Sequence, residues 1–496
     1  MLFNSFNYLI FFPLVVLFYF VIPVKYTKVR NLWLLIASYY FYMNWNAAYA
    51  LLLFGSTFIT YLAGLGIGAA KLKGRESLAK TVLAGSFLVN LSILFFYKYA
   101  NFFAQNLNRI LGMTGSESNI PMFDILLPVG ISFYIFQALG YTMDVYRGQI
   151  QATKNLFRYM LFVSFFPQLV AGPIERSYNL LGQFDEEHRF DVNRVREGLL
   201  IMLWGLFMKI VIADNVAGYV NVVYGNYAGY TGVEVILATV LFAFQIYCDF
   251  GGYSYIAIGS AKVLGFALME NFHAPYQAIS VKDFWSRWHK SLTTWFTDYL
   301  YIPLGGNRKG KVRKYINTFI VFFVSGMWHG AAWSYVIWGV LNGIYMIVED
   351  ATKAWRGKMK TACKVDESRF SYRLGCGLIT FALVDFSWLF FRAEGVGHAL
   401  DLIKHTIISL QFEQVFGLAV NRMGFSVQQL VALIIAFALL FTVDILINKG
   451  KDVGKLVLEQ GIWFRWFIYI GLLFMIMTYG AYGLDFTQTE FIYFQF

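Results

Sequence analysis

The chain has 496 residues, of which 58% are hydrophobic, 20% are aromatic and only 14% are charged. Soluble domains carry about 25% charged residues, so this composition excludes a soluble multidomain protein. It predicts an all-α protein that crosses a membrane many times. The net charge of +11 needs no nucleic-acid partner, because Lys and Arg beside an anionic leaflet account for it. We therefore expect membrane lipid, and no nucleic acid, as a partner.

Apolar segments long enough to cross about 30 Å of hydrocarbon recur along the whole chain. They are residues 8–24, 31–46, 47–70, 81–105, 122–146, 197–220, 232–262, 373–392, 428–447 and 462–483, while residues 315–349 are long enough for a helical hairpin. Residues 155–175 contain Pro167 and Pro173 and are typical of a re-entrant segment. The sequence predicts about ten to twelve transmembrane helices in one integral membrane domain. Its parts are N-terminal helices (1–146), a core (155–349) and C-terminal helices (373–483).

The distribution of Lys and Arg predicts the orientation of these spans. The first apolar segment is followed by Lys25, Lys28 and Arg30, so the positive-inside rule places the N-terminus outside. Propagation along the chain places the basic loops 71–80, 147–158, 308–314, 353–373 and 449–455 in the cytoplasm. The predicted outer loops 106–121, 221–231, 393–427 and 484–496 contain only Arg109, Lys404 and Arg422 as basic residues.

Polar side chains inside apolar segments are candidates for function or for structural ion pairs. Lys209 and Asp214 lie five residues apart in one segment, and Asp249 precedes Gly251 and Gly252 in another. A structural ion pair and helix packing are the alternatives to chemistry at these positions. The three cysteines (Cys248, Cys363 and Cys376) show no paired spacing, so we expect neither a disulfide framework nor a metal site.

Two of the six histidines have unusual surroundings. His289 lies among Trp285, Arg287, Trp288, Lys290 and Asp298 in "DFWSRWHKSLTTWFTDYLYIPLGG", residues 283–306. This mixture of aromatic and charged residues is typical of a membrane interface or of a funnel that dips into it. An ordinary amphipathic interfacial helix remains the alternative. The other four, His188, His273, His398 and His405, lie in or beside predicted loops.

His329 lies in "GMWHGAAW", residues 326–333, beside Trp328. It follows Tyr315 by a distance of roughly 21 Å along a helix, which places it well inside the bilayer. Gly326 and Gly330 share a helical face, so another helix or a ligand can approach closely there. A core histidine with satisfied hydrogen bonds, or a haem or metal ligand, are the alternatives to a catalytic residue.

Six segments together resemble the membrane-bound O-acyltransferase superfamily, and more closely its bacterial branch for alginate and peptidoglycan O-acetylation. They are "FFPQLVAGPIER" (165–176), "KIVIADN" (209–215), "DFGGYSYIAIG" (249–259), "ENFHAPY" (270–276), the long motif 283–306 and "GMWHGAAW" (326–333). The chain departs from the pattern at Gly251, Tyr255 and Thr297, where the acetylation branch usually has serine, aspartate and arginine. Both histidines of the pattern are present.

The resemblance implies a ring of helices around a tunnel through the bacterial cell membrane, entered by an acyl thioester from the cytoplasm. His329 would act as general base, because neutral imidazole suits proton removal near pH 7. His289 and the indole N–H groups of Trp285, Trp288 and Trp328 are candidates to stabilise the oxyanion. Arg287, Lys290, Arg308 and Lys309 would hold an anionic donor such as acetyl-CoA. We expect no tightly bound cofactor.

The predicted function is O-acetylation of an extracellular or cell-wall polysaccharide through a secreted acetyltransferase partner. D-alanyl transfer to teichoic acid is the alternative within the superfamily. A lipid or polysaccharide transporter on the same scaffold is the alternative of another class, although the chain shows no inverted pair of broken helices.

Overall fold

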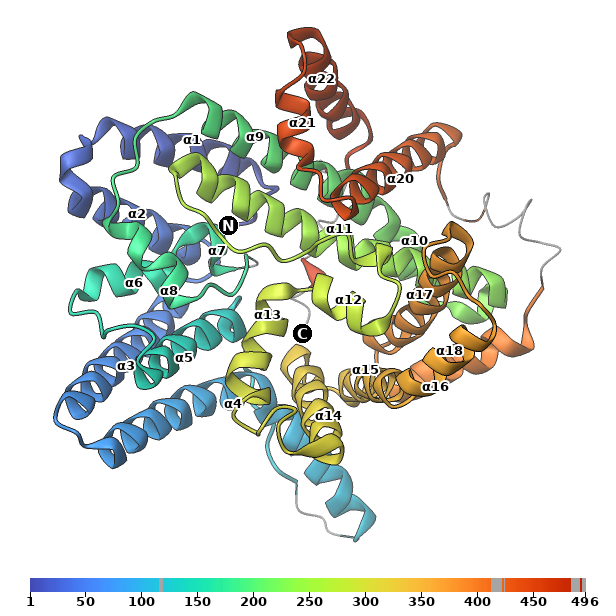
Figure 1. The fold of residues 1–496 in the computed structure, drawn as a ribbon, viewed down its shortest axis with the longest axis horizontal. Helices are drawn as coiled ribbons and strands as arrows, with labels where there is room; N and C mark the ends of the chain where they lie inside the picture. Colours follow the sequence, from blue (N-terminus) through green and yellow to red (C-terminus); the bar gives the residue numbers. More distant parts are fainter. Residues whose placement is uncertain (116–118, 171, 412–421, 423, 483–490, 493–496) are drawn as a thin grey trace. The chain divides into compact units, whose positions relative to one another are not determined.

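The structure is a computed structural model that describes residues 1–115, 119–170, 172–411, 422, 424–482 and 491–492 (Figure 1). Regular structure within these residues consists of helices without strands, which confirms the predicted all-α class. The chain forms two compact units. The first comprises Met1–Leu199 with Ile256–Met269, and the second comprises Leu200–Tyr255 with Glu270–Phe496.

Seven helices of the described chain are long and apolar enough to cross a membrane, so this is a multi-pass membrane protein. They are α3 (Ala47–Leu72), α4 (Glu76–Met113), the continuous helix Val192–Gly225, α11 (Gly232–Leu264), α17 (Phe370–Arg392), α20 (Val427–Asn448) and α22 (Ile462–Tyr479). The pair α1 (Phe6–Val21) and α2 (Thr27–Met43) is bent by 111° and would make an eighth span if it crosses as one. The prediction of ten to twelve crossings counts α1 and α2 separately. It also includes the segments that form α5, α14 and α15.

The first unit is built around α5 (Ile131–Arg147), a helix whose side chains are nearly all buried. It packs against α3, where a Cβ on Gly64 would lie 2.6 Å from the ring of Tyr141. The segment expected to be re-entrant forms two short helices, α6 (Leu156–Ser164) and α7 (Phe166–Leu169). Pro167 lies in the first turn of α7, where a missing N–H costs no helical hydrogen bond.

The second unit contains the buried polar cluster of the sequence. Lys209 lies in a π-helical stretch, Phe207–Ala213, that joins α9 (Val192–Leu206) to α10 (Asp214–Gly225). Its ammonium group lies 2.7 Å from Asp214 and 2.8 Å from Asp249 of α11. Asp249 also accepts a hydrogen bond of 2.8 Å from the backbone N–H of Ile492. The cluster therefore joins α10 to α11 and contacts the backbone at Ile492.

The predicted hairpin 315–349 is present as α14 (Gly310–His329) and α15 (Trp333–Ala351), separated by a break of three residues. A Cβ on Gly326 would lie 2.5 Å from the carbonyl oxygen of Tyr335, and one on Gly339 would lie 2.3 Å from that of Phe322. The small-residue face that was predicted to admit a helix or a ligand is therefore occupied by α15.

The long motif 283–306 forms two short helices and a π-helical turn. α12 (Val281–Arg287) begins at Ser280, whose hydroxyl accepts a hydrogen bond from the backbone N–H of Asp283. α13 (Lys290–Phe296) continues into the π-helical stretch Thr297–Tyr301. The remaining α-helices within the described residues are α8 (Ser177–Leu180), α16 (Lys353–Ala362), α18 (Val396–Ile408) and α21 (Val453–Leu458).

Candidate active site

His289 occupies the junction between α12 and α13 in a strained backbone conformation. Its φ is 44°, in the left-handed region that non-glycine residues rarely adopt. The junction is fixed on both sides, because Trp288 N–H donates to the carbonyl of Phe284 at 2.8 Å and Lys290 N–H donates to that of Asn271 at 2.9 Å. Strain of this kind persists where the surroundings enforce it, and it is common at functional sites. Here it turns the imidazole into the protein, where only 1% of the residue is exposed.

His329 is the last residue of α14 and is also buried, with 4% of its surface exposed. Aromatic rings surround it: Trp338 has its centroid 4.8 Å away, Trp328 5.0 Å and Phe391 5.3 Å. Trp328 also contacts His289, with ring centroids 6.1 Å apart. One indole thus touches both imidazoles, which brings together two histidines separated by forty residues of sequence.

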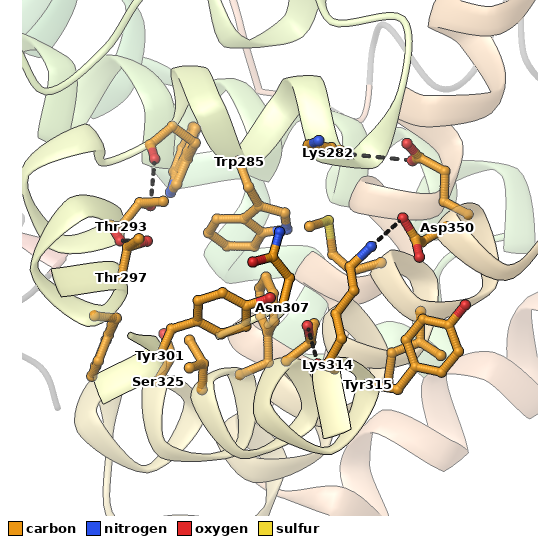
Figure 2. Close-up of a pocket in the computed structure, with 18 of the residues that line it drawn as sticks. Lys282, Trp285, Thr293, Thr297, Tyr301, Asn307, Lys314, Tyr315, Ser325 and Asp350 are labelled. Atoms are coloured by element: carbon orange, nitrogen blue, oxygen red, sulfur yellow. Dashed lines mark hydrogen bonds and ion pairs between the residues drawn. The ribbon is translucent and has the colours of Figure 1, made fainter. Parts of the chain in front are cut away.

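A cavity of about 720 Å³ is lined by both histidines and lies entirely within the second unit. Figure 2 shows Trp285 of α12, the Tyr301 and Asn307 side chains that follow α13, and Lys314 and Ser325 of α14 around it. Trp288 also lines it. The indole nitrogen of Trp285 is buried and has no hydrogen-bond partner within the described residues. Trp285 thus provides a donor beside the cavity that no acceptor in the described part of the chain uses.

The charged part of the cavity wall contains five basic and three acidic side chains. They are Lys282, Lys314, Lys353, Arg356 and Lys360 together with Glu349, Asp350 and Glu367. Lys314 lies 2.5 Å from Asp350, and Lys360 lies 2.9 Å from Glu367 (Figure 2 shows the first pair). The wall therefore carries a positive excess suited to an anionic molecule, while its neighbouring aromatic wall suits an apolar one.

Several residues predicted for donor binding lie outside this lining. Arg287 pairs with Asp283 at 2.7 Å and donates to the Asn448 side chain at 2.7 Å. Lys290 pairs with Glu270 at 2.6 Å. Asp298, Arg308, Lys309 and Trp328 are likewise not among the residues that line the cavity.

The basic residues that do line the cavity were not singled out in the sequence. Lys353, Arg356 and Lys360 come from α16, Lys282 lies in α12 before His289, and Lys314 lies in α14, the helix that ends at His329. They lie in or beside predicted cytoplasmic loops, where the positive-inside rule accounts for basic residues without a binding site. The spacing 353, 356, 357 and 360 on one helical face was the signal that could have grouped three of them.

Burial sets the protonation state of His289, which lies outside the candidate spans. Desolvation lowers the pKa of its imidazole to about 3, because the charged form is disfavoured away from water. This lowered pKa favours the neutral form of the His289 imidazole near pH 7. A neutral imidazole can donate one hydrogen bond or position a substrate without adding charge to the cavity.

Within the described residues, no group of three or more His, Cys, Asp or Glu side chains is arranged to hold a metal ion. The cavity lining includes imidazole, indole and ammonium groups. Two buried histidines on one cavity, an unused N–H donor and a basic rim can together hold an anionic acyl donor and remove a proton from an acceptor.

Comparison with known proteins identifies the family. Residues 149–367 match the sequence model of the membrane-bound O-acyltransferase family. The chain is 37% identical over 438 residues to a probable alginate O-acetylase of Pseudomonas syringae pv. tomato, covering 88% of this chain and 81% of that protein. It is 34% identical over 400 residues to a peptidoglycan O-acetyltransferase of Helicobacter pylori, covering 75% and 73%.

A teichoic acid D-alanyltransferase of Streptococcus thermophilus is less similar, at 28% identity over 289 residues, with 53% of this chain and 68% of that protein covered. The chain belongs to the membrane-bound O-acyltransferase family and is an enzyme that transfers acyl groups.

Proposed function

We propose that the enzyme transfers an acetyl group from a cytoplasmic thioester, such as acetyl-CoA, toward the outer face of a bacterial cell membrane. There the group serves O-acetylation of an extracellular or cell-wall polysaccharide, through a secreted acetyltransferase partner. The observation that carries the proposal is the cavity that joins both buried histidines to a rim of five basic side chains. The relatives named as O-acetylases support acetyl as the group transferred.

His329 is the proposed general base. Its neutral imidazole removes the proton of the acceptor hydroxyl as that oxygen attacks the thioester carbonyl. The tetrahedral intermediate then expels the thiolate, which takes up a proton, and the acetyl ester remains on the acceptor. The negative oxygen of the intermediate needs preorganised donors, for which the Trp285 indole N–H and His289 are the proposed candidates.

The basic rim is the proposed site for the donor's phosphates. Lys282, Lys353 and Arg356 line the same cavity as the histidines, so the phosphates and the thioester of one extended donor can be bound together. The proposal requires the rim to lie on the cytoplasmic side and the N-terminus to lie outside, which is the orientation that the Lys and Arg distribution predicts.

The proposal is tested by the chemistry of the esters formed in cells. The protein would be expressed with the proposed secreted acetyltransferase partner in a strain that lacks both. Acetate and D-alanine released from surface polymers by mild base would then be measured. We expect acetate to depend on this chain. Release of D-alanine in place of acetate would replace the proposal with the alanyl alternative, and release of neither would contradict acyl transfer to a surface polymer.

A further inference from the structure

Helix α16 has two opposite faces of different character. Lys353, Arg356, Gly357 and Lys360 line the cavity and share one face at the 3.6-residue period. On the opposite face lie Trp355, Lys358, Met359 and Ala362, all exposed. The Trp355 side chain is 62% exposed and that of Met359 is 46% exposed. The helix therefore forms one wall of the donor cavity and presents an amphipathic face outward.

The helix has little packing of its own to hold it in place. None of its residues is buried. Its contacts with the flanking segments of the same chain include a hydrogen bond of 2.6 Å from Arg356 to the carbonyl of Glu349 and the ion pair of Lys360 with Glu367. A short helix in water without a packed apolar face is only marginally stable. A second surface is therefore needed to hold α16 against the cavity.

The outward face has the composition of a membrane-surface helix. On this face Lys358 lies beside Trp355 and Met359, and the ten-residue helix as a whole has four basic residues and no acidic one. Trp prefers the level of the lipid headgroups, and basic residues are attracted to an anionic leaflet. The span α17 begins eight residues after α16 ends, at Phe370, which is 78% exposed. A lipid surface therefore always lies within reach of α16.

We propose that α16 docks on the anionic cytoplasmic leaflet through Trp355, Lys358 and Met359, and that this docking holds the basic wall of the donor cavity in place. Anionic lipid then acts as a regulator of donor binding, because it favours the arrangement in which Lys353, Arg356 and Lys360 face the cavity. The regulatory part rests on the proposed function, since it takes the cavity to be the donor site.

The docking is tested with a fluorophore on α16. Met359→Cys would be labelled with an environment-sensitive dye in a Cys363→Ser/Cys376→Ser background and reconstituted in vesicles. The vesicles would contain phosphatidylcholine alone or phosphatidylcholine with phosphatidylglycerol. We expect a blue shift and quenching by nitroxide lipids that increase with phosphatidylglycerol. Lys455→Cys, an exposed position of α21, is the control and should show the smaller change. A label on α16 that remains in water in both kinds of vesicle would overturn the proposal.

The regulatory part is tested by acetyl-CoA binding in the same vesicles. We expect the wild type to bind acetyl-CoA more tightly when phosphatidylglycerol is present. Trp355→Ala and Lys358→Glu should each lose about fivefold in affinity in those vesicles, while Lys455→Glu should not. Equal binding in both vesicle types would overturn the regulation. An acidic carrier protein would also be added to the Trp355→Ala variant. If acetyl-CoA binding by this variant were restored only by that protein, the outward face would be assigned to a protein partner and the lipid proposal would be overturned.

These outcomes are distinct from a failure of the proposed function. His329→Ala should bind acetyl-CoA with the same dependence on lipid as the wild type, because His329 lies on α14 and not on α16. If that variant still transferred acetyl groups, the proposed chemistry would fail while the lipid dependence of binding stood.

Discussion

The two buried histidines differ in backbone and surroundings, and this difference indicates different roles. His289 has a left-handed backbone between two short helices, whereas His329 ends a long helix and is enclosed by Trp328, Trp338 and Phe391. A residue whose strained backbone is held by hydrogen bonds on both sides is suited to keep a precise position. His289 is therefore expected to orient the donor or stabilise the oxyanion, and His329 to move the proton.

The low pKa of His289 gives a prediction for stability against pH. The folded state binds this proton only near pH 3, whereas an unfolded histidine binds it near pH 6.5. Between these values the unfolded state binds more protons, so the free energy of unfolding falls as pH is lowered. From pH 6.5 to 5 this one group costs about 2 kcal/mol.

We therefore expect the melting temperature of His289→Gln in detergent to fall less than that of the wild type between pH 7 and pH 5. The variant should also keep part of the acetyl-transfer activity but bind the donor abnormally. If the melting temperatures of the two proteins fell equally between pH 7 and pH 5, the prediction that His289 is buried in its neutral form would be wrong. Transfer at the wild-type rate would return His289 to the role of an ordinary interfacial residue.

At the scale of elements, the predicted and observed helices agree where the length of an apolar segment or the position of a proline determines the local fold. The hairpin of α14 and α15 was predicted from segment length, and the interruption of the segment 155–175 was predicted from Pro167 and Pro173, although its two short helices were not. The motif 283–306 was predicted as one interfacial stretch, but it breaks at His289. A left-handed residue enforced by hydrogen bonds to Phe284 and Asn271 leaves no local signal in the sequence.

The site was predictable in its histidines and less so in its charges. His289, His329, Trp285 and Trp288 line the cavity, and the family pattern named them. The cavity's basic residues come from segments as far apart as 282 and 360, and only the tertiary fold brings them together. The nearer candidates Arg287 and Lys290 have acidic partners instead, Asp283 and Glu270.

The contact between α14 and α15 gives a prediction at this scale. Gly339→Ala would place a methyl group 2.3 Å from the carbonyl oxygen of Phe322, so α14 and α15 must separate. We expect a loss of about 1–3 kcal/mol in stability, as for other overpacked interiors, and a displaced His329 with reduced transfer. Melting in detergent and acetyl transfer would be measured together.

Gly375→Ala is the matched control, because no atom lies within 4 Å of a Cβ at that position of α17. This change should be neutral or stabilising by about 1 kcal/mol, since alanine favours the helix. If both variants melted alike, the close packing of α14 on α15 would be wrong.

At the scale of the whole molecule, the account requires the basic rim of the cavity to face the cytoplasm. Cys363 directly follows α16 and is exposed, whereas Cys248 is buried. With Cys376 replaced by alanine, a membrane-impermeant maleimide should label Cys363 in inverted membrane vesicles and not in intact cells. Ile408→Cys, at the end of α18 on the predicted outer side, should show the reverse pattern, because Ile408 is 73% exposed. Labelling of Cys363 from outside would overturn the orientation and the cytoplasmic donor.

The central claim is that His329 is the base of an acyl transfer, and acetyl content of the surface polymer in cells that express His329→Ala tests it most directly. Loss of a general base lowers a rate by about 10²–10⁴-fold, so acetylation should fall to background while the protein still accumulates and melts as the wild type does. His273→Ala, which removes a histidine outside the cavity lining, should keep wild-type acetylation. Full acetylation by His329→Ala, at normal protein level, would contradict the account.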